Sequence, residues 1–236
     1  MTPESLCRVI AHRGDHTHAP ENTLAAFTAA IQVGADQIEL DVRRSQDGIP
    51  LVFHDPDLEG QPLATLTWVE IQARQPTIPT LEETLLQVRG KISLDIELKE
   101  AGYEEQVLAL ICSILTPNHY VITSFLPEVV RRVKTLEPHL QVGLLVDSQI
   151  PCQEKGSLLT NCREVGADFL APHHSWVDPE FLTLANQAGI PLYVWTVNDP
   201  ERIRMCLQSQ AIIGLITDYP HLALQIRAQL GQKSSN

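Results

Sequence analysis

The feature that most constrains the fold is the regular alternation of strand and helix patterns from residue 91 onward. Strands are expected at 91–99, 120–125, 141–147, 167–172, 191–197 and 214–218, and helices at 103–115, 127–136, 154–165, 178–188, 199–209 and 221–230. Strands that alternate with helices in this way are joined by crossover connections and run parallel. The pattern therefore predicts an α/β fold built around a parallel sheet.

The first part of the chain extends the same pattern. Strands are expected at 8–14 and 37–43, and helices at 20–33, 67–74 and 80–88, with residues 56–79 otherwise irregular and polar. Together with the six later strands this makes eight, which in 236 residues is the size of a (β/α)8 or TIM barrel. The alternative is an open doubly wound sheet, which normally has a glycine-rich first turn that this sequence lacks. We predict one TIM-barrel domain over residues 1–236.

Composition limits the classes of partner. The chain is 44% hydrophobic and 19% charged, which is typical of a globular protein with a sizeable core. A net charge of −12 without a basic stripe argues against nucleic acid and against electrostatic docking on membranes. No signal peptide and no apolar run of about 20 residues is recognisable. The five cysteines lack CxxC spacing, which indicates reduced thiols. We expect a cytoplasmic protein, a monomer or homodimer, without stable membrane association.

Residues 37–55 carry an unusual charge pattern. Glu39 and Asp41 fall on one face of the expected strand, whereas a strand covered by helices normally is apolar on both faces. Asp47-Gly48 is a strong hairpin signal, so the chain should return antiparallel and bring His54 back towards the two acids. We therefore predict a β-hairpin after the second strand of the barrel.

Three acidic residues are expected to meet at the ends of neighbouring strands. Glu39 and Asp41 end the second strand and Glu97 ends the third, and active sites of TIM barrels lie at these carboxyl ends. Carboxylates that face one another repel, and a hard cation such as Mg²⁺ or Ca²⁺ relieves the repulsion. The alternative is that Lys99 and Arg43 neutralise these acids without a metal.

Two histidines are candidates for proton transfer. His12 ends the first strand and His54 follows the hairpin, so both should reach the rim that carries the acids. An ordinary pKa near 6.5 suits a histidine to proton transfer in both directions at neutral pH. The other histidines have no partner pattern and are expected on the surface or behind the site, with His173 the nearest.

Four further residues are candidates for binding an anionic substrate. Arg13 and Lys99 offer positive charge for an anionic oxygen. Strict alternation points Arg13 away from the lumen, so its inward role requires the chain to leave strand geometry at Gly14. Phe125 and Trp195 stand at strand ends, where an aromatic side chain either walls a pocket or belongs to the core.

The same residues resemble the glycerophosphodiester phosphodiesterase family over nearly the whole chain. The matching motifs are His12-Arg13-Gly14, Pro20-Glu21-Asn22-Thr23, Glu39-Leu40-Asp41-Val42, Asp47-Gly48, His54-Asp55, Ile78-Pro79-Thr80-Leu81-Glu82-Glu83, Glu97-Leu98-Lys99, Trp195-Thr196-Val197-Asn198 and Thr217-Asp218-Tyr219-Pro220. The resemblance implies a TIM barrel that hydrolyses glycerophosphodiesters to sn-glycerol 3-phosphate and an alcohol with a divalent cation. It implies metal ligands at Glu39, Asp41 and Glu97. It also implies an acid–base pair at His12 and His54, and phosphate contacts from Arg13 and Lys99.

One departure from the family concerns its small insertion. Residues 56–79 form a reduced version of it, and Glu59-Gly60-Gln61 replaces the Arg-Thr-Thr expected there. Because the insertion helps to cover the glycerol side of the site, substrate choice stays open. One alternative is a lysophospholipase D or a phospholipase-like lyase that acts on lipids. Another is a barrel that binds phosphodiesters without turning them over.

Overall fold

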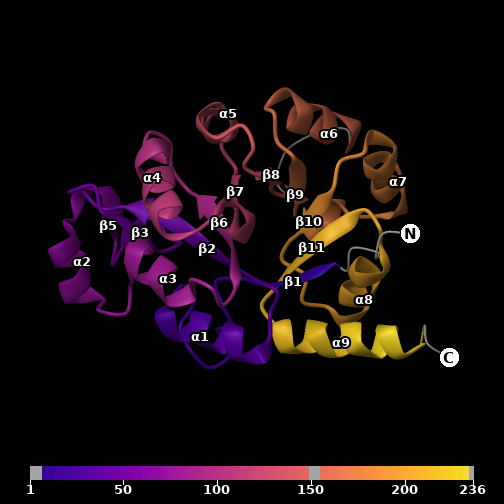
Figure 1. Ribbon diagram of the computed structural model, residues 1–236, viewed down its shortest axis with the longest axis horizontal. Helices are drawn as coiled ribbons and strands as arrows, with labels where there is room; N and C mark the ends of the chain where they lie inside the picture. Colours follow the sequence, from indigo (N-terminus) through magenta and orange to yellow (C-terminus); the bar gives the residue numbers. More distant parts are fainter. Residues whose placement is uncertain (1–6, 149–154, 234–236) are drawn as a thin grey trace.

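The computed structural model describes residues 7–148 and 155–233, whose strands close into a barrel (Figure 1). The barrel strands are β1 (Arg8–Ala11), β2 (Gln37–Arg44), β6 (Ser93–Leu98), β7 (Tyr120–Ser124), β8 (Val142–Val146), β9 (Phe169–Pro172), β10 (Leu192–Val194) and β11 (Ile212–Thr217). Each is parallel to its neighbours, and β1 pairs with both β11 and β2, which closes the sheet. The predicted TIM barrel is confirmed.

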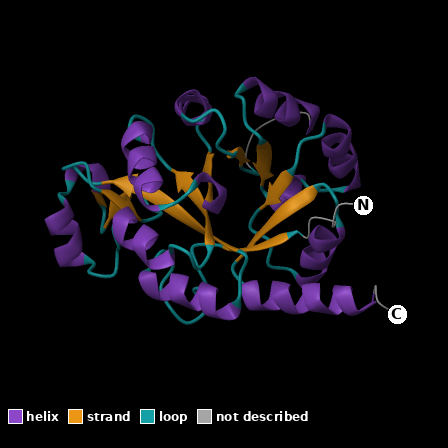
Figure 2. Ribbon diagram, in the orientation of Figure 1, coloured by secondary structure: helices purple, strands orange, loops and turns teal. Residues whose placement is uncertain are grey.

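Helices lie outside the strands (Figure 2). They are α1 (Leu24–Val33), α3 (Leu81–Val88), α4 (Glu104–Ile114), α5 (Pro127–Leu136), α6 (Lys155–Glu164), α7 (Pro179–Ala188), α8 (Pro200–Gln208) and α9 (Pro220–Lys233), with 3-10 turns η2 (Pro117–His119) and η3 (His174–Trp176). Side-chain caps fix several starts, as at Asp178 and Asp199, each followed by a proline at the first helical position. No helix in the described ranges is long and apolar enough to cross a membrane.

Side chains fill the barrel interior beneath its carboxyl end. One apolar cluster consists of Ile10, Val121, Leu145, Phe169, Ala171, Tyr193 and Ile216. Two glycines make room for its rings, because a Cβ at Gly143 would lie 2.2 Å from Phe169 and one at Gly214 would lie 2.6 Å from Tyr193. The larger cluster packs strands against helices. The barrel interior is therefore filled with tightly packed side chains, as in other barrels of this kind.

The predicted hairpin is present, and the segment after it has a core of its own. β3 (Pro50–Val52) runs antiparallel to β2. The segment then forms β4 (Asp57–Leu58), β5 (Gln61–Pro62), η1 (Leu63–Thr65) and α2 (Trp68–Arg74). Its apolar side chains form a separate cluster of Leu51, Leu58, Leu63, Leu66, Ile71 and Ile78. The expectation of an irregular, polar segment at 56–79 was therefore wrong outside α2, since spaced leucines fold it over a small core.

Candidate active site

A cavity of about 250 Å³ opens at the carboxyl ends of the barrel strands. Eight of the nine predicted site residues line it, and Asp41, the ninth, contacts two of them. The eight are His12, Arg13, Glu39, His54, Glu97, Lys99, Phe125 and Trp195. The strand ends thus bring residues far apart in the sequence to one place, as parallel strands of a closed barrel require.

Three carboxylates form a buried cluster beside this cavity. Glu39, Asp41 and Glu97 are 5%, 1% and 7% exposed, and their ligand oxygens lie within 4.8 Å of one another. The register of β2 and β6 causes this proximity, because Asp41 lies directly opposite Glu97. Alternation along β2 then places Glu39 on the same face as Asp41.

Two cations contact this cluster, mainly at Asp41. Lys99 Nζ lies 3.2 Å from Asp41 Oδ1 and 2.7 Å from Glu97 Oε1, while Arg13 Nε lies 3.1 Å from Asp41 Oδ2. The proposed neutralisation by Arg43 was wrong, because its guanidinium pairs with Glu100 and donates to a backbone carbonyl instead. Neutralisation by Lys99 is present in part.

These two cations do not stabilise the negative charge of all three carboxylates. Burial and the neighbouring Asp41 raise the pKa of Glu97 to about 8, and the same causes raise the pKa of Glu39 well above its usual value. Burial also opposes ionisation of Asp41, but Lys99, Arg13 and a hydrogen bond from Asn22 lower its pKa to about 2. Two buried acids with raised pKa values and a set of ligands that offers only oxygen atoms fit a hard divalent cation.

The loop after β1 turns Arg13 towards the cavity. β1 ends at Ala11, and Arg13 and Gly14 adopt φ values of 55° and 84°. The predicted departure from strand geometry therefore occurs, and Arg13 lines the cavity. Its guanidinium also pairs with Glu21 at 2.6 Å, and its backbone N–H donates to Glu39 Oε2 at 3.0 Å.

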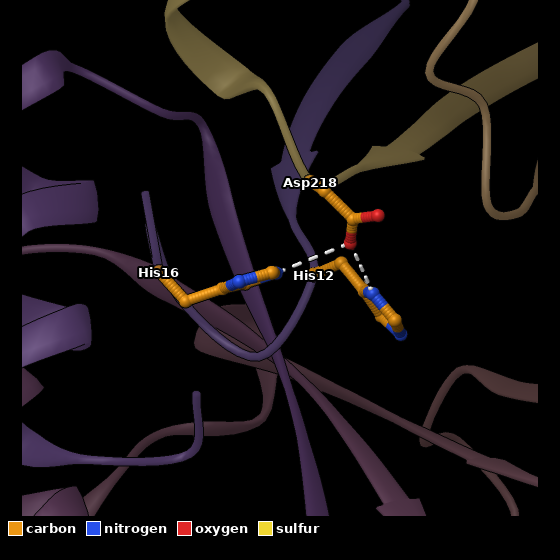
Figure 3. A group of neighbouring side chains, drawn as sticks. All are labelled: His12, His16 and Asp218. Carbon is orange, nitrogen blue, oxygen red and sulfur yellow. Dashed lines mark hydrogen bonds and ion pairs between the residues drawn. The ribbon is translucent and has the colours of Figure 1, made fainter. Parts of the chain in front are cut away.

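His12 is held by a carboxylate from the last barrel strand (Figure 3). Its Nδ1 lies 2.7 Å from Oδ1 of Asp218, which directly follows β11. Because a carboxylate only accepts, this bond selects the tautomer with the proton on Nδ1. Nε2 then presents a lone pair, 3.9 Å from Glu39 Oε2. Asn198 orients Asp218 by donating to its Oδ2 at 2.6 Å.

His54 stands on the other side of the cavity. Its Nδ1 lies 2.7 Å from Asp55 Oδ1, so each of the two candidate histidines has a carboxylate partner. Burial lowers the pKa of His54, although the charge of Asp41 opposes this. An anion bound in the cavity would raise that pKa again by favouring the imidazolium.

Two aromatic side chains wall the cavity. The rings of Phe125 and Trp195 meet edge to face with centroids 5.4 Å apart, and Lys99 Nζ lies 5.7 Å from the Phe125 centroid. Trp195 Nε1 donates to Ala171 O at 2.7 Å, which fixes the indole. His173 packs edge-on against Trp195, with centroids 5.2 Å apart.

Three further polar residues lie at or beside the cavity. Of these, Asp218 was named only within the Thr217-Asp218-Tyr219-Pro220 motif, and Asp95 and His16 were not assigned to the site. Asp95 lies opposite Glu39 in the sheet and accepts from Thr123 at 2.7 Å, and burial raises its pKa to about 7. The described residues offer no hydrogen-bond donor to its Oδ2. Alternation placed Asp95 on the face of Glu97, which was the available signal. His16 Nε2 lies 3.2 Å from Asp218 Oδ1, which places His16 behind the site, one of the two positions expected for the histidines without a partner pattern.

Comparison with known proteins gives a consistent result. Residues 12–222 match the Glycerophosphoryl diester phosphodiesterase family. A glycerophosphodiester phosphodiesterase from Caldanaerobacter subterraneus subsp. tengcongensis is 31% identical over 240 residues, covering 92% of this chain and 96% of the relative. A crystal structure of the Thermotoga maritima glycerophosphodiester phosphodiesterase is similar with a TM-score of 0.81 and 27% identity over 94% of this chain and 98% of that one. An Oleispira antarctica phosphodiesterase, solved with the product sn-glycerol-3-phosphate, is similar with a TM-score of 0.79 and 29% identity over 94% and 96%.

Proposed function

Because this chain belongs to the glycerophosphoryl diester phosphodiesterase family and is a phosphoric diester hydrolase, we propose that it releases sn-glycerol 3-phosphate and an alcohol from glycerophosphodiesters with one divalent cation, Mg²⁺ or Ca²⁺. The observation that carries this proposal is the cavity itself. It combines three buried carboxylates, two cationic side chains and two histidines, each with a carboxylate partner.

The carboxylate cluster is the proposed cation site. Glu39, Asp41 and Glu97 would hold the cation through oxygen atoms, with water or substrate completing its coordination. A bound divalent cation supplies charge neutralisation of the phosphate and polarises a phosphoryl oxygen. It would also relieve the repulsion that raises the pKa values of Glu39 and Glu97.

Two side chains of the cavity are proposed to bind the phosphate. Arg13 presents a planar guanidinium suited to paired oxygens, and its contact with Asp41 fixes its direction. Lys99 adds a point charge from the end of β6, held between Asp41 and Glu97. Positioning and charge neutralisation of this kind dominate phosphoryl transfer.

The histidines are proposed to move the protons. Nε2 of His12 has a free lone pair because Asp218 holds the proton on Nδ1, so His12 is the base that accepts the proton of the nucleophile. His54, protonated when the phosphodiester anion is bound, gives its proton to the departing alkoxide oxygen. The nucleophile is water, or the glycerol hydroxyl of the substrate followed by water. Either route consumes one water for each phosphodiester hydrolysed.

Product analysis separates this reaction from the lipid alternative. Wild-type protein is incubated with glycerophosphocholine and, separately, with lysophosphatidylcholine micelles, and products are identified by ³¹P NMR with the His12→Ala variant as control. We expect sn-glycerol 3-phosphate from the first substrate, and release falling by a factor of at least about 10² in the variant. Lysophosphatidic acid as the main product would instead show a lysophospholipase D. No product from either substrate would favour the non-catalytic barrel.

The cellular location, substrate class and assembly of the protein are proposed on separate grounds. Free thiols at Cys7, Cys112, Cys162 and Cys206 support the cytoplasm, whereas Cys152 lies outside the described residues. The net charge of −12 supports a small-molecule substrate rather than nucleic acid. A monomer or homodimer remains the proposed assembly.

A further inference from the structure

We propose that His12, His16 and Asp218 form a second metal site, separate from the carboxylate cluster, which takes a transition metal ion such as Zn²⁺ and thereby inhibits the enzyme. Only the inhibitory consequence rests on the proposed role of His12 as the base. Metal binding at this site is an independent claim that can be measured without turnover.

The three ligands converge from two segments at the same edge of the barrel (Figure 3). His12 and His16 lie in the loop after β1, and Asp218 directly follows the neighbouring strand β11, whose Thr217 pairs with Ala11. One potential ligand atom from each side chain lies within 4.8 Å of the other two. Asp218 Oδ1 lies 2.7 Å from His12 Nδ1 and 3.2 Å from His16 Nε2.

These spacings are close to what a tetrahedral metal ion needs. Ligand bonds of about 2.0–2.1 Å place neighbouring donor atoms about 3.3 Å apart. The separation between His16 and Asp218 already has this value, and that between His12 and Asp218 would widen by roughly half an ångström. The donor atoms of His12 and His16, which lie within 4.8 Å of each other, would approach by up to about 1.5 Å.

The surrounding structure holds the ligands in position. The loop that carries the histidines is anchored where Asp15 N donates to Ala26 O at 3.0 Å, and where Thr17 Oγ1 donates to Asp15 Oδ1 at 2.7 Å. Asn198 donates to Asp218 Oδ2 at 2.6 Å, which leaves Oδ1 facing the histidines. Such outer hydrogen bonds orient metal ligands and strengthen their sites.

The donor types distinguish this site from the carboxylate cluster. Two imidazoles and one carboxylate are the ligand set of many three-residue zinc sites, whereas Mg²⁺ and Ca²⁺ prefer oxygen donors alone. The side chains of His12, His16 and Asp218 are 18%, 26% and 25% exposed. Water can therefore reach the site as the fourth ligand.

Metal binding would switch the tautomer of His12. An ion bound to Nδ1 displaces the proton that Asp218 holds there, and in the neutral ring this proton moves to Nε2. Nε2 then carries hydrogen and cannot accept the proton of the nucleophile. The ion likewise displaces the proton that His16 Nε2 donates to Asp218, and the neutral ring of His16 then carries its proton on Nδ1. The result is reversible inhibition without loss of the proposed Mg²⁺ or Ca²⁺.

The direct test is calorimetric titration of the full chain with Zn²⁺ in excess Mg²⁺. His16→Ala should raise the Zn²⁺ Kd by about tenfold or more, since even outer-contact mutations at metal sites cost 10–100-fold. His18→Ala is the matched control because His18 is an exposed histidine of the same loop, and its Kd should stay at the wild-type value. Glu97→Gln, which weakens the carboxylate cluster, should retain Zn²⁺ binding.

Visible absorption of bound Co²⁺ gives a second readout. We expect bands of a nitrogen-ligated ion in wild-type protein and their loss in His16→Ala and in His16→Gln, with circular dichroism verifying that each variant is folded. Equal Zn²⁺ affinity of wild-type protein and His16→Ala would overturn the proposal. So would loss of Zn²⁺ binding in Glu97→Gln alone, since the ion would then occupy the carboxylate cluster.

Discussion

Raising the pH of the metal-free protein from about 5 to about 9 should destabilise it through the buried Glu97. The pKa of this carboxyl is about 8 in the folded protein against 4.5 ordinarily, because burial and Asp41 disfavour its charge. Between these values the folded state keeps a proton that the unfolded state has lost, so stability falls as the pH rises. At about 1.36 kcal/mol per pKa unit, the difference between the folded and the ordinary pKa of Glu97 corresponds to a loss of about 5 kcal/mol in the free energy of unfolding.

Urea unfolding in EDTA at several pH values measures this loss, with Glu97→Gln as the matched variant. The variant lacks the titrating group, so its free energy of unfolding should fall much less over the same range. The comparison with the variant is essential because Glu39, Asp95 and His16, whose pKa values are also raised in the folded protein, change stability in the same direction. Added Mg²⁺ or Ca²⁺ should restore stability to wild-type protein most strongly at high pH.

Two results would refute this reasoning. If the free energy of unfolding changed with pH in the same way for wild-type protein and Glu97→Gln, the pKa of Glu97 would not be raised in the folded protein. A stability that rises with pH in wild-type protein, and is insensitive to divalent cations, would show that the carboxylates are neutralised by Lys99 and Arg13 alone.

Three further predictions concern individual residues. His12→Ala and His54→Ala should each lower kcat by at least about 10²-fold with unchanged circular dichroism, and near-wild-type turnover in either variant would remove that histidine from the mechanism. Asp218→Asn should lower kcat more than it changes KM and should shift the pH–rate profile, because His12 loses the partner that sets its tautomer; an unchanged profile would contradict this. Gly14→Ala should lower Tm by several degrees, since its φ is +84° and a Cβ would lie 2.8 Å from the backbone of α1. Gly48→Ala, with φ +83° but no neighbouring atom within 4 Å, is its control and should lower Tm less.

The sequence predicted the carboxylate cluster because strand geometry leaves little freedom. In β2, alternation puts Glu39 and Asp41 on one face, and a parallel neighbour in register brings Glu97 alongside. The sequence predicted an inward direction for Arg13 only if the chain leaves strand geometry at Gly14. This could not be decided from the sequence, because the positive φ depends on how Gly14 packs against α1.

Other contacts form only when the barrel closes, and no local sequence pattern predicts them. His12 meets Asp218 because β1 pairs with β11 across almost the whole length of the chain. His16 lies in a loop without periodicity, so its bond to Asp218 has no signature in the sequence. The core of residues 56–79 was missed for a similar reason, since its leucines follow neither a strand nor a helix period.

The most direct test of the proposed function is sn-glycerol 3-phosphate release from glycerophosphocholine and glycerophosphoethanolamine. It is measured with EDTA-treated protein, after addition of Mg²⁺ or Ca²⁺, and with the Glu97→Gln variant. We predict release that depends on the added cation and falls sharply in the variant. Undiminished release by folded, metal-free protein, or no release with any cation, would contradict it.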